Sequence, residues 1–399
     1  MTNELTPSRR RFLQALGGCA FLSLPSVTLP GFVQAAGAAP PAGNILVLVE
    51  LAGGNDGLNT VVPTRDAAYR ALRPEIGIAR RNTLGLDRRT GLHPSMTEVA
   101  ALWQDGELRI VEGVGYPSPN RSHFRSIEIW NSGRGADSLD RQGWVSAAFA
   151  TGGPDRSDAD GLVLGGAMGP LAGPGRFSAM RDEELFFETQ ANLPGGGHQV
   201  RPAAASPLAH VLRTYDSAQI TGAAILKRLE ASPARRFPFP DTELGQQLRT
   251  AARLLDAGVE TAVLKVVQDG YDTHEAQPDT HSGLLRDLSA SLGAFAAALR
   301  RIGLWEKVTV VTYSEFGRTA HENASGGTDH GAAAPVLVAG GSVEGGLAGG
   351  RPSLERVADG DLEYTTDYRR VYEAILRDLW GIDAGLAGGP GTPLRLLAA

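Results

Sequence analysis

Continuous runs of apolar residues mark the strands that this chain is predicted to form. Residues 44–51 (NILVLVEL) are apolar at nearly every position, which is typical of a central parallel strand buried on both faces. Shorter apolar runs predict four further strands, at 108–113, 261–267, 308–312 and 335–339. The pattern therefore indicates one large buried sheet.

Segments in which apolar residues recur at helical spacing lie between these runs. Strands that alternate with helices predict an α/β fold whose sheet is mostly parallel and doubly wound. The predicted helices span residues 94–104, 124–130, 208–229, 242–255, 282–302 and 367–379.

One segment breaks this alternation. Residues 151–204 are rich in Gly, Pro and Ala and show little periodicity, so we expect a loop-rich insertion or cap. The insertion would belong to a single α/β domain over residues 39–399, a length that suits one large domain.

Residues 1–38 have the features of an export signal. A twin-arginine pattern at 8–14 (SRRRFLQ) precedes a weakly apolar stretch at 15–33, and small residues suited to cleavage follow. Gly and Pro interrupt the apolar stretch, which makes it a poor membrane span. We therefore expect a signal peptide, export by the twin-arginine translocase, and a mature protein in the periplasm or outside the cell.

Composition narrows the chemistry of the mature protein. The only cysteine, Cys19, lies in the signal, so disulfides and thiolate ligands are excluded and any metal must be held by His, Asp or Glu. The formal net charge of −6 becomes −8 once the three Arg and one Glu of the signal are removed. A mildly acidic chain without Lys/Arg clusters argues against nucleic acid as a partner.

Acidic and imidazole side chains follow several predicted strands. In open α/β sheets, ligands bind at the carboxyl edge, and carboxylates with imidazoles are the ligands of zinc and manganese. A carboxylate cluster there would repel itself without a cation. We therefore predict one or two divalent ions (zinc, manganese or calcium). The candidate metal ligands are Asp56, Asp272, His274, Glu315, Asp329 and His330.

Other readings stay open for individual residues. Asp56, in an Asn-Asp-Gly sequence, also suits an Asx-turn or a helix N-cap. Ser122 opens a predicted helix, where its hydroxyl could attack a phosphate or sulfate that the helix N-terminus stabilises, or could serve as a plain N-cap. Arg318 and Arg125 are candidates to balance the carboxylates or to clamp an anionic substrate. His93 is interpreted as structural.

The motifs around these residues resemble a known secreted family, called domain of unknown function 1501. They are GGNDGLN at 53–59, NRSHF at 120–124, GYDTH at 270–274, SEFGRT at 314–319 and GTDHG at 327–331. The resemblance spans the mature chain almost end to end. This family is itself similar to the alkaline phosphatase and sulfatase superfamily, so the resemblance implies an alkaline-phosphatase-like fold with two metals beside a nucleophile.

The resemblance also implies roles for residues. Asp56 and Glu315 would hold one metal and Asp272 with His274 the other, and His330 corresponds to a further metal-binding His. Ser122 would be the nucleophile and Arg318 a second catalytic residue that clamps the transferred group. The assignments to substrate binding are Asn55, His123 and Arg125.

One departure from the superfamily pattern leaves two functional hypotheses open. Phe316 stands where the superfamily has a metal-binding His, so Asp329 supplies the missing ligand, or the protein holds one metal, or catalysis is lost. The first hypothesis is an exported metal-dependent hydrolase of a phosphate or sulfate ester. The alternative is a non-catalytic alkaline-phosphatase-like envelope protein that binds a partner or polymer.

Overall fold

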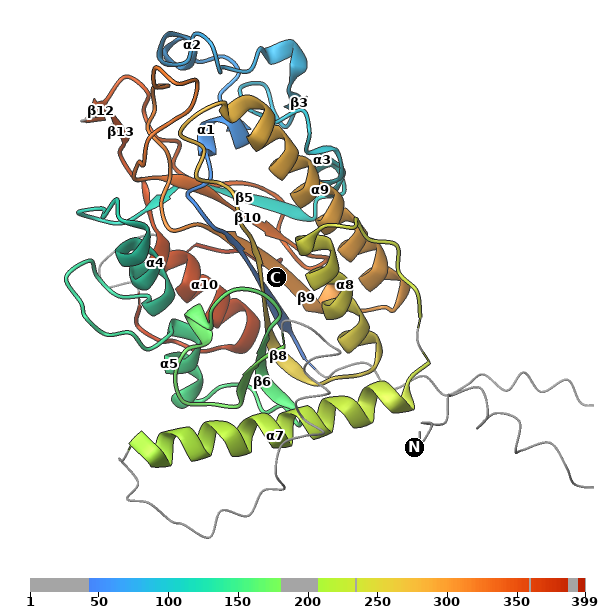
Figure 1. Cartoon of the computed structure of the whole chain (residues 1–399). Coiled ribbons are helices and arrows are strands. Elements are labelled where there is room, and N and C mark those ends of the chain that lie inside the picture. Colours follow the sequence, from blue (N-terminus) through green and yellow to red (C-terminus); the bar gives the residue numbers. More distant parts are fainter. Residues whose placement is uncertain (1–42, 181–206, 234, 359, 387–393, 399) are drawn as a thin grey trace, which may run out of the picture. The chain divides into compact units, whose positions relative to one another are not determined.

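A nine-stranded sheet organises the described part of the chain (Figure 1). Its order is β11-β5-β10-β9-β1-β8-β6-β7, and β14 also pairs with β5. Only β10 runs antiparallel to its neighbours, so the predicted mostly parallel α/β fold is confirmed. The strands are β1 (Ile45–Leu51), β5 (Leu108–Gly115), β6 (Ala159–Val163), β7 (Phe177–Ala179), β8 (Thr261–Gln268), β9 (Val308–Tyr313), β10 (Ala334–Ala339), β11 (Gly346–Gly349) and β14 (Thr366–Asp367).

This computed structural model describes residues 43–180, 207–233, 235–358, 360–386 and 394–398. All of them belong to one unit that spans residues 38–399. The predicted signal peptide with Cys19 lies outside the described residues.

Alternate residues of the strands pack on opposite faces of the sheet. In β1, Val47 and Val49 enter one apolar cluster, whereas Leu46 and Leu48 enter another. The two helix layers in Figure 1 cover these two faces. The first layer contains α3 (Thr97–Gln104), α8 (Glu243–Asp256) and α9 (Gln277–Arg301), and the second contains α4 (His123–Ser132), α5 (Trp144–Ala150) and α10 (Tyr368–Trp380).

Further elements complete the described part of the fold. Two small sheets lie outside the central one, and α7 contacts β7. None of the helices among the described residues is long and apolar enough to cross a membrane. These elements are α1 (Gly57–Thr60), α2 (Ala67–Leu72), α7 (Pro207–Ala231), β2 (Val61–Val62), β3 (Leu84–Gly85), β4 (Gly91–Leu92), β12 (Val357–Ala358) and β13 (Asp361–Leu362).

The expected cap over residues 151–204 needs a correction. Its described part, 151–180, contains β6 and β7, and β6 pairs in parallel with β8. The segment therefore forms one side of the central sheet. Both strands are short, and Gly161 interrupts β6, so neither shows a long apolar run. Residues 181–204 lie outside the described part of the chain.

The carboxyl edge of the sheet collects the predicted site segments. The strands β1, β5, β8 and β9 end there, and because β10 is antiparallel to β9 its first residue lies at the same edge. The chain connects β9 to β10 directly, without a crossover helix. Within this connection Arg318 and His330 form an antiparallel bridge, which brings its two ends together.

Candidate metal centre

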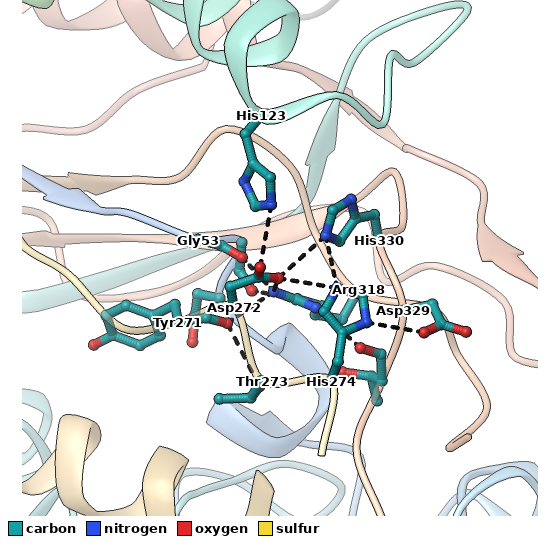
Figure 2. A network of polar contacts seen from close by, with 12 residues as sticks. Gly53, His123, Tyr271, Asp272, Thr273, His274, Arg318, Asp329 and His330 are labelled. Atoms are coloured by element: carbon teal, nitrogen blue, oxygen red, sulfur yellow. Dashed lines mark hydrogen bonds and ion pairs between the residues drawn. The ribbon is translucent and has the colours of Figure 1, made fainter. Parts of the chain in front are cut away.

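Three imidazoles converge on one carboxylate, that of Asp272 in the loop after β8 (Figure 2). The Asp272 Oδ1 atom lies 3.0 Å from His274 Nε2 and 3.1 Å from His330 Nε2. Its Oδ2 atom lies 3.4 Å from His123 Nε2. One ligand atom from each of His123, Asp272 and His330 can be chosen so that all lie within 4.8 Å of one another.

Each of these imidazoles is held through its other ring nitrogen, Nδ1, by an oxygen. Backbone carbonyls and ionised carboxylates only accept hydrogen bonds, so Nδ1 donates, and in the neutral imidazole Nε2 then carries the lone pair on the side of Asp272. Metal-binding histidines are oriented in this way. The pairs are His123 with Glu315 Oε1 (3.0 Å), His274 with Asp329 Oδ1 (3.0 Å) and His330 with the carbonyl oxygen of Arg121 (2.7 Å).

Two of the inward nitrogens are unusually close to each other. His274 Nε2 and His330 Nε2 are 2.9 Å apart. Two facing lone pairs at this distance repel unless a proton or a metal ion lies between them. Two nitrogens bound to one tetrahedral zinc ion at about 2.0–2.1 Å would be roughly 3.3–3.4 Å apart, so a shift of about 0.4–0.5 Å between the two rings would admit the ion. The residues present therefore fit a metal ion.

Arg318 positions Asp272 and is not available to a substrate. Its side chain is buried, and Nη2 donates to Asp272 Oδ1 at 2.6 Å. Burial raises the pKa of Asp272, but the hydrogen bond and the positive charge of Arg318 outweigh it and lower that pKa to about 2. The predicted clamp on substrate oxygens is therefore wrong. The other acceptors of Arg318 are the carbonyl oxygens of Gly53, Gly54, Tyr271 and Thr328.

Glu315 and Asp329 support the imidazoles. Glu315 is buried, and its Oε1 atom accepts from the backbone N–H of Gly53 at 2.8 Å as well as contacting His123. Gly53 has φ +114°, and a Cβ there would lie 2.4 Å from the Asp272 nitrogen, so the turn requires glycine. Both acids, predicted as ligands, contact the outer nitrogens. His123, predicted to bind substrate, presents Nε2 to the centre.

Asp56 lies in a buried network of its own. It caps α1 through the N–H of Leu58 (3.2 Å) and pairs with Arg73 at 2.6 Å, and Gln277 donates to it at 2.5 Å. Burial raises its pKa, but Arg73 outweighs this and lowers it overall. The N-cap reading is therefore confirmed, and the carboxylate assigned to a metal is already balanced. No sequence signal pointed to Arg73, since arginines are usually solvent-exposed.

Phe316 packs against the imidazoles without ligating anything. Its ring is buried and stacks on His330, with centroids 4.4 Å apart, and lies 4.9 Å from the ring of His123. The phenyl ring instead restricts the orientation of two candidate ligands.

Two residues predicted to bind substrate have structural partners. Asn55 is buried, and its Oδ1 atom accepts from Thr60 (3.0 Å) and contacts His281 Nε2 (2.9 Å). Arg125 Nη1 donates to Glu128 at 3.2 Å, and its Nη2 donates to backbone carbonyls of the loop after α4. Neither side chain is directed to the metal centre by these contacts.

Ser122 remains the candidate nucleophile. It is the N-cap residue of α4, but its hydroxyl makes no capping hydrogen bond. It is exposed and lies between Arg121, whose carbonyl holds His330, and His123. Its predicted place beside the centre at a helix N-terminus is therefore consistent with the geometry.

Family comparison supports the resemblance. The model of the family described as protein of unknown function (DUF1501) matches residues 204–387. That stretch contains Asp272, His274 and the whole β9–β10 connection, so the resemblance is confirmed for this part of the chain. A comparison with curated proteins gave no match.

Several solved structures are similar to this chain at low identity. A phosphonate monoester hydrolase of Agrobacterium radiobacter is 12% identical over 88% of this chain and 79% of its own, with a TM-score of 0.40. The PsFucS1 sulfatase from Pseudoalteromonas sp. is 10% identical over 84% and 67%, with a TM-score of 0.37. An alkaline phosphatase superfamily protein from Vibrio parahaemolyticus is 9% identical over 87% and 68%, with a TM-score of 0.38. Likenesses this distant carry no inference about activity.

Proposed function

We propose that this protein is an exported metal-dependent hydrolase of phosphate or sulfate esters, built around one divalent ion. The observation that carries the proposal is the convergence of three Nε2 atoms on Asp272, each imidazole being held from behind by an oxygen acceptor. The ester class comes from the resemblance of the sequence motifs, and the site's chemistry supports it.

The ligands of the ion would be His123, Asp272 and His330, and His274, whose Nε2 atom contacts the last two, would be a fourth. Imidazoles with one carboxylate suit zinc or manganese better than calcium, which takes six to eight oxygen ligands. A second ion is not expected, because Arg73 already balances Asp56. When bound, the ion would stabilise negative charge on the transferred group and make a nearby hydroxyl more acidic.

Ser122 would act as the nucleophile. Its Oγ atom would bond to the phosphorus or sulfur and lose its proton to solvent, while the bond to the ester oxygen breaks and the alcohol leaves protonated. Water would then cleave the seryl ester, release phosphate or sulfate and restore the serine. The backbone N–H groups at the start of α4 would favour the anionic group.

A second candidate function is binding without catalysis. Phe316 and the Asp56–Arg73 pair remove one of the two metal positions that the resemblance implies. A protein with a single ion could use it to hold an anionic envelope polymer. In either case, we propose export through the twin-arginine translocase to the periplasm or beyond.

The test is the metal content of residues 39–399 purified without chelators. We expect one zinc or manganese ion per chain in the parent, its loss in His330→Ala, and its retention in His321→Ala, which removes an exposed histidine outside the cluster. A parent that stays metal-free after incubation with each ion contradicts the proposal.

Ester hydrolysis then separates the two candidates. Hydrolysis of aryl phosphate or aryl sulfate by the metal-loaded parent, lost in Ser122→Ala while the metal remains, supports the hydrolase. The second candidate is favoured if the protein binds the metal tightly and binds anionic polymers but hydrolyses neither ester.

A further inference from the structure

An open pocket of about 820 Å³ has one lining residue, Arg121, in direct contact with the candidate metal centre. Two of its lining residues connect it to the centre. Arg121 holds His330 through its carbonyl oxygen and precedes Ser122, and Ala332 follows His330 by two residues. The lining includes Pro119, Arg121, Ala332, Asp361, Glu363 and Tyr364.

The charges of this pocket are nearly balanced. The Arg121 guanidinium pairs with the carboxylate of Asp361. Glu363 lies 3.9 Å from the guanidinium of Arg356. Because each carboxylate faces a guanidinium, the pocket offers no unbalanced negative charge that would select a cationic ligand.

The polar groups that line the pocket suit a ligand that carries hydroxyl groups. Carboxylates accept hydrogen bonds, and Arg121, whose side chain is 46% exposed, donates them. The ring of Tyr364 is 37% exposed and adds an apolar surface. An aromatic surface combined with a few polar groups of both kinds is typical of sites that bind neutral polar molecules of moderate size.

We propose that this pocket receives the alcohol part of the substrate, a neutral polyhydroxylated group such as a sugar, while the ester group lies at the metal centre. The inference rests on the proposed function and adds the class of alcohol. In this arrangement Arg121 would donate to the ester oxygens in place of its partner Asp361. Arg318 and Arg125, in contrast, are occupied by backbone carbonyls.

The kinetic test compares two esters that carry the same anion. We expect Tyr364→Ala to raise KM about tenfold for a hexose phosphate or sulfate, with kcat little changed, because contacts made equally in the ground and transition states affect KM alone. KM for methyl phosphate or methyl sulfate should stay the same. The matched control is Phe124→Ala, which removes an aromatic ring that is 85% exposed and outside the pocket. Equal changes for both esters would overturn the inference.

A binding test works without turnover. The probes are neutral hexoses, N-acetylhexosamines and glycerol, and their contact with the protein is measured by saturation-transfer NMR. We expect saturation transfer to these probes from the parent, from the Phe124→Ala control and from the metal-free His330→Ala variant. Transfer should be lost in Tyr364→Ala. No transfer to the parent, equal transfer to Tyr364→Ala, or stronger transfer to choline than to the sugars would overturn the inference. Because this readout needs neither metal nor hydrolysis, its failure is distinct from failure of the proposed function.

Discussion

Two aspartates at the same edge of the sheet have opposite surroundings. Asp56 follows β1 and Asp272 follows the neighbouring strand β8, each after a short Gly-containing turn. Asp56 is 1% exposed and neutralised by Arg73. The side chain of Asp272 is 46% exposed and faces three imidazoles as well as Arg318. The same local pattern therefore yields a structural ion pair in one loop and a candidate metal ligand in the other.

The difference lies in what reaches each carboxylate from elsewhere in the chain. Arg73 arrives from the end of α2 and closes its site against solvent. His123 and His330 arrive at Asp272 with their outer nitrogens already satisfied, which leaves lone pairs and an opening to solvent. We therefore expect changes at Asp56 to act on stability and changes around Asp272 to act on metal binding.

Asp56→Ala should give the largest effect. It leaves the Arg73 guanidinium buried without its carboxylate, and breaking a buried pair in this way costs about 3–5 kcal/mol in the free energy of unfolding. Urea denaturation of the metal-free protein measures it, with Asp329→Ala, which removes an exposed acid, as control. A loss below about 1 kcal/mol would contradict the buried-pair interpretation.

His330→Ala tests the expectation that the surroundings of Asp272 bind a metal ion. Loss of one candidate ligand should lower zinc or manganese affinity more than about 100-fold, since even supporting residues contribute 10–100-fold. Competition with a chelating dye measures the affinity. Unchanged binding would exclude His330 as a ligand.

Glu315→Gln should have a smaller effect on the same property. The amide can still accept a hydrogen bond from His123 Nδ1 but lacks the charge, so we expect affinity to fall by about 10-fold, within the range for outer partners. A fall as large as that of His330→Ala would show that Glu315 itself binds the ion.

The free energy of unfolding should also depend on pH, because His93 and His281 are buried. Burial lowers the pKa of both His93 and His281 to about 4, below their ordinary value of 6.5. Each histidine is therefore protonated more readily in the unfolded chain, and the stability that its neutral form allows is lost as pH falls from 6.5 toward 4. His93→Asn keeps an acceptor for the N–H of Ser95 and cannot titrate.

Between pH 7 and 4.5, the free energy of unfolding of this variant, measured without metal, should fall by about 2 kcal/mol less than that of the parent. Parallel pH profiles for the two proteins would mean that His93 is not buried as a neutral group.

Ser122→Ala should have the smallest effect on stability. Its hydroxyl makes no capping hydrogen bond, so the change should cost no more than about 0.5 kcal/mol, below the usual value for an N-cap serine. Metal content should be unchanged while ester hydrolysis is lost. Retained hydrolysis would remove Ser122 from the mechanism.

The sequence alone determined the fold class and the edge at which the site lies. Continuous apolar runs and helical spacing are local signals of burial, so the core strands and long helices were predictable. The strands β6, β7, β11 and β14 were missed because they are short. Strand ends also placed Asp272, His274 and His330 at one edge, since parallel strands end together.

Only the tertiary structure decided what each polar residue does. Glu315 and His123 are separated by 192 positions in the sequence, and their contact changes both assignments. Arg73 converts Asp56 from an expected ligand into half of an ion pair, and backbone carbonyls occupy Arg318. A residue type and its local spacing define what a side chain can bind. Which partner it binds depends on burial and on groups that folding brings from distant parts of the chain.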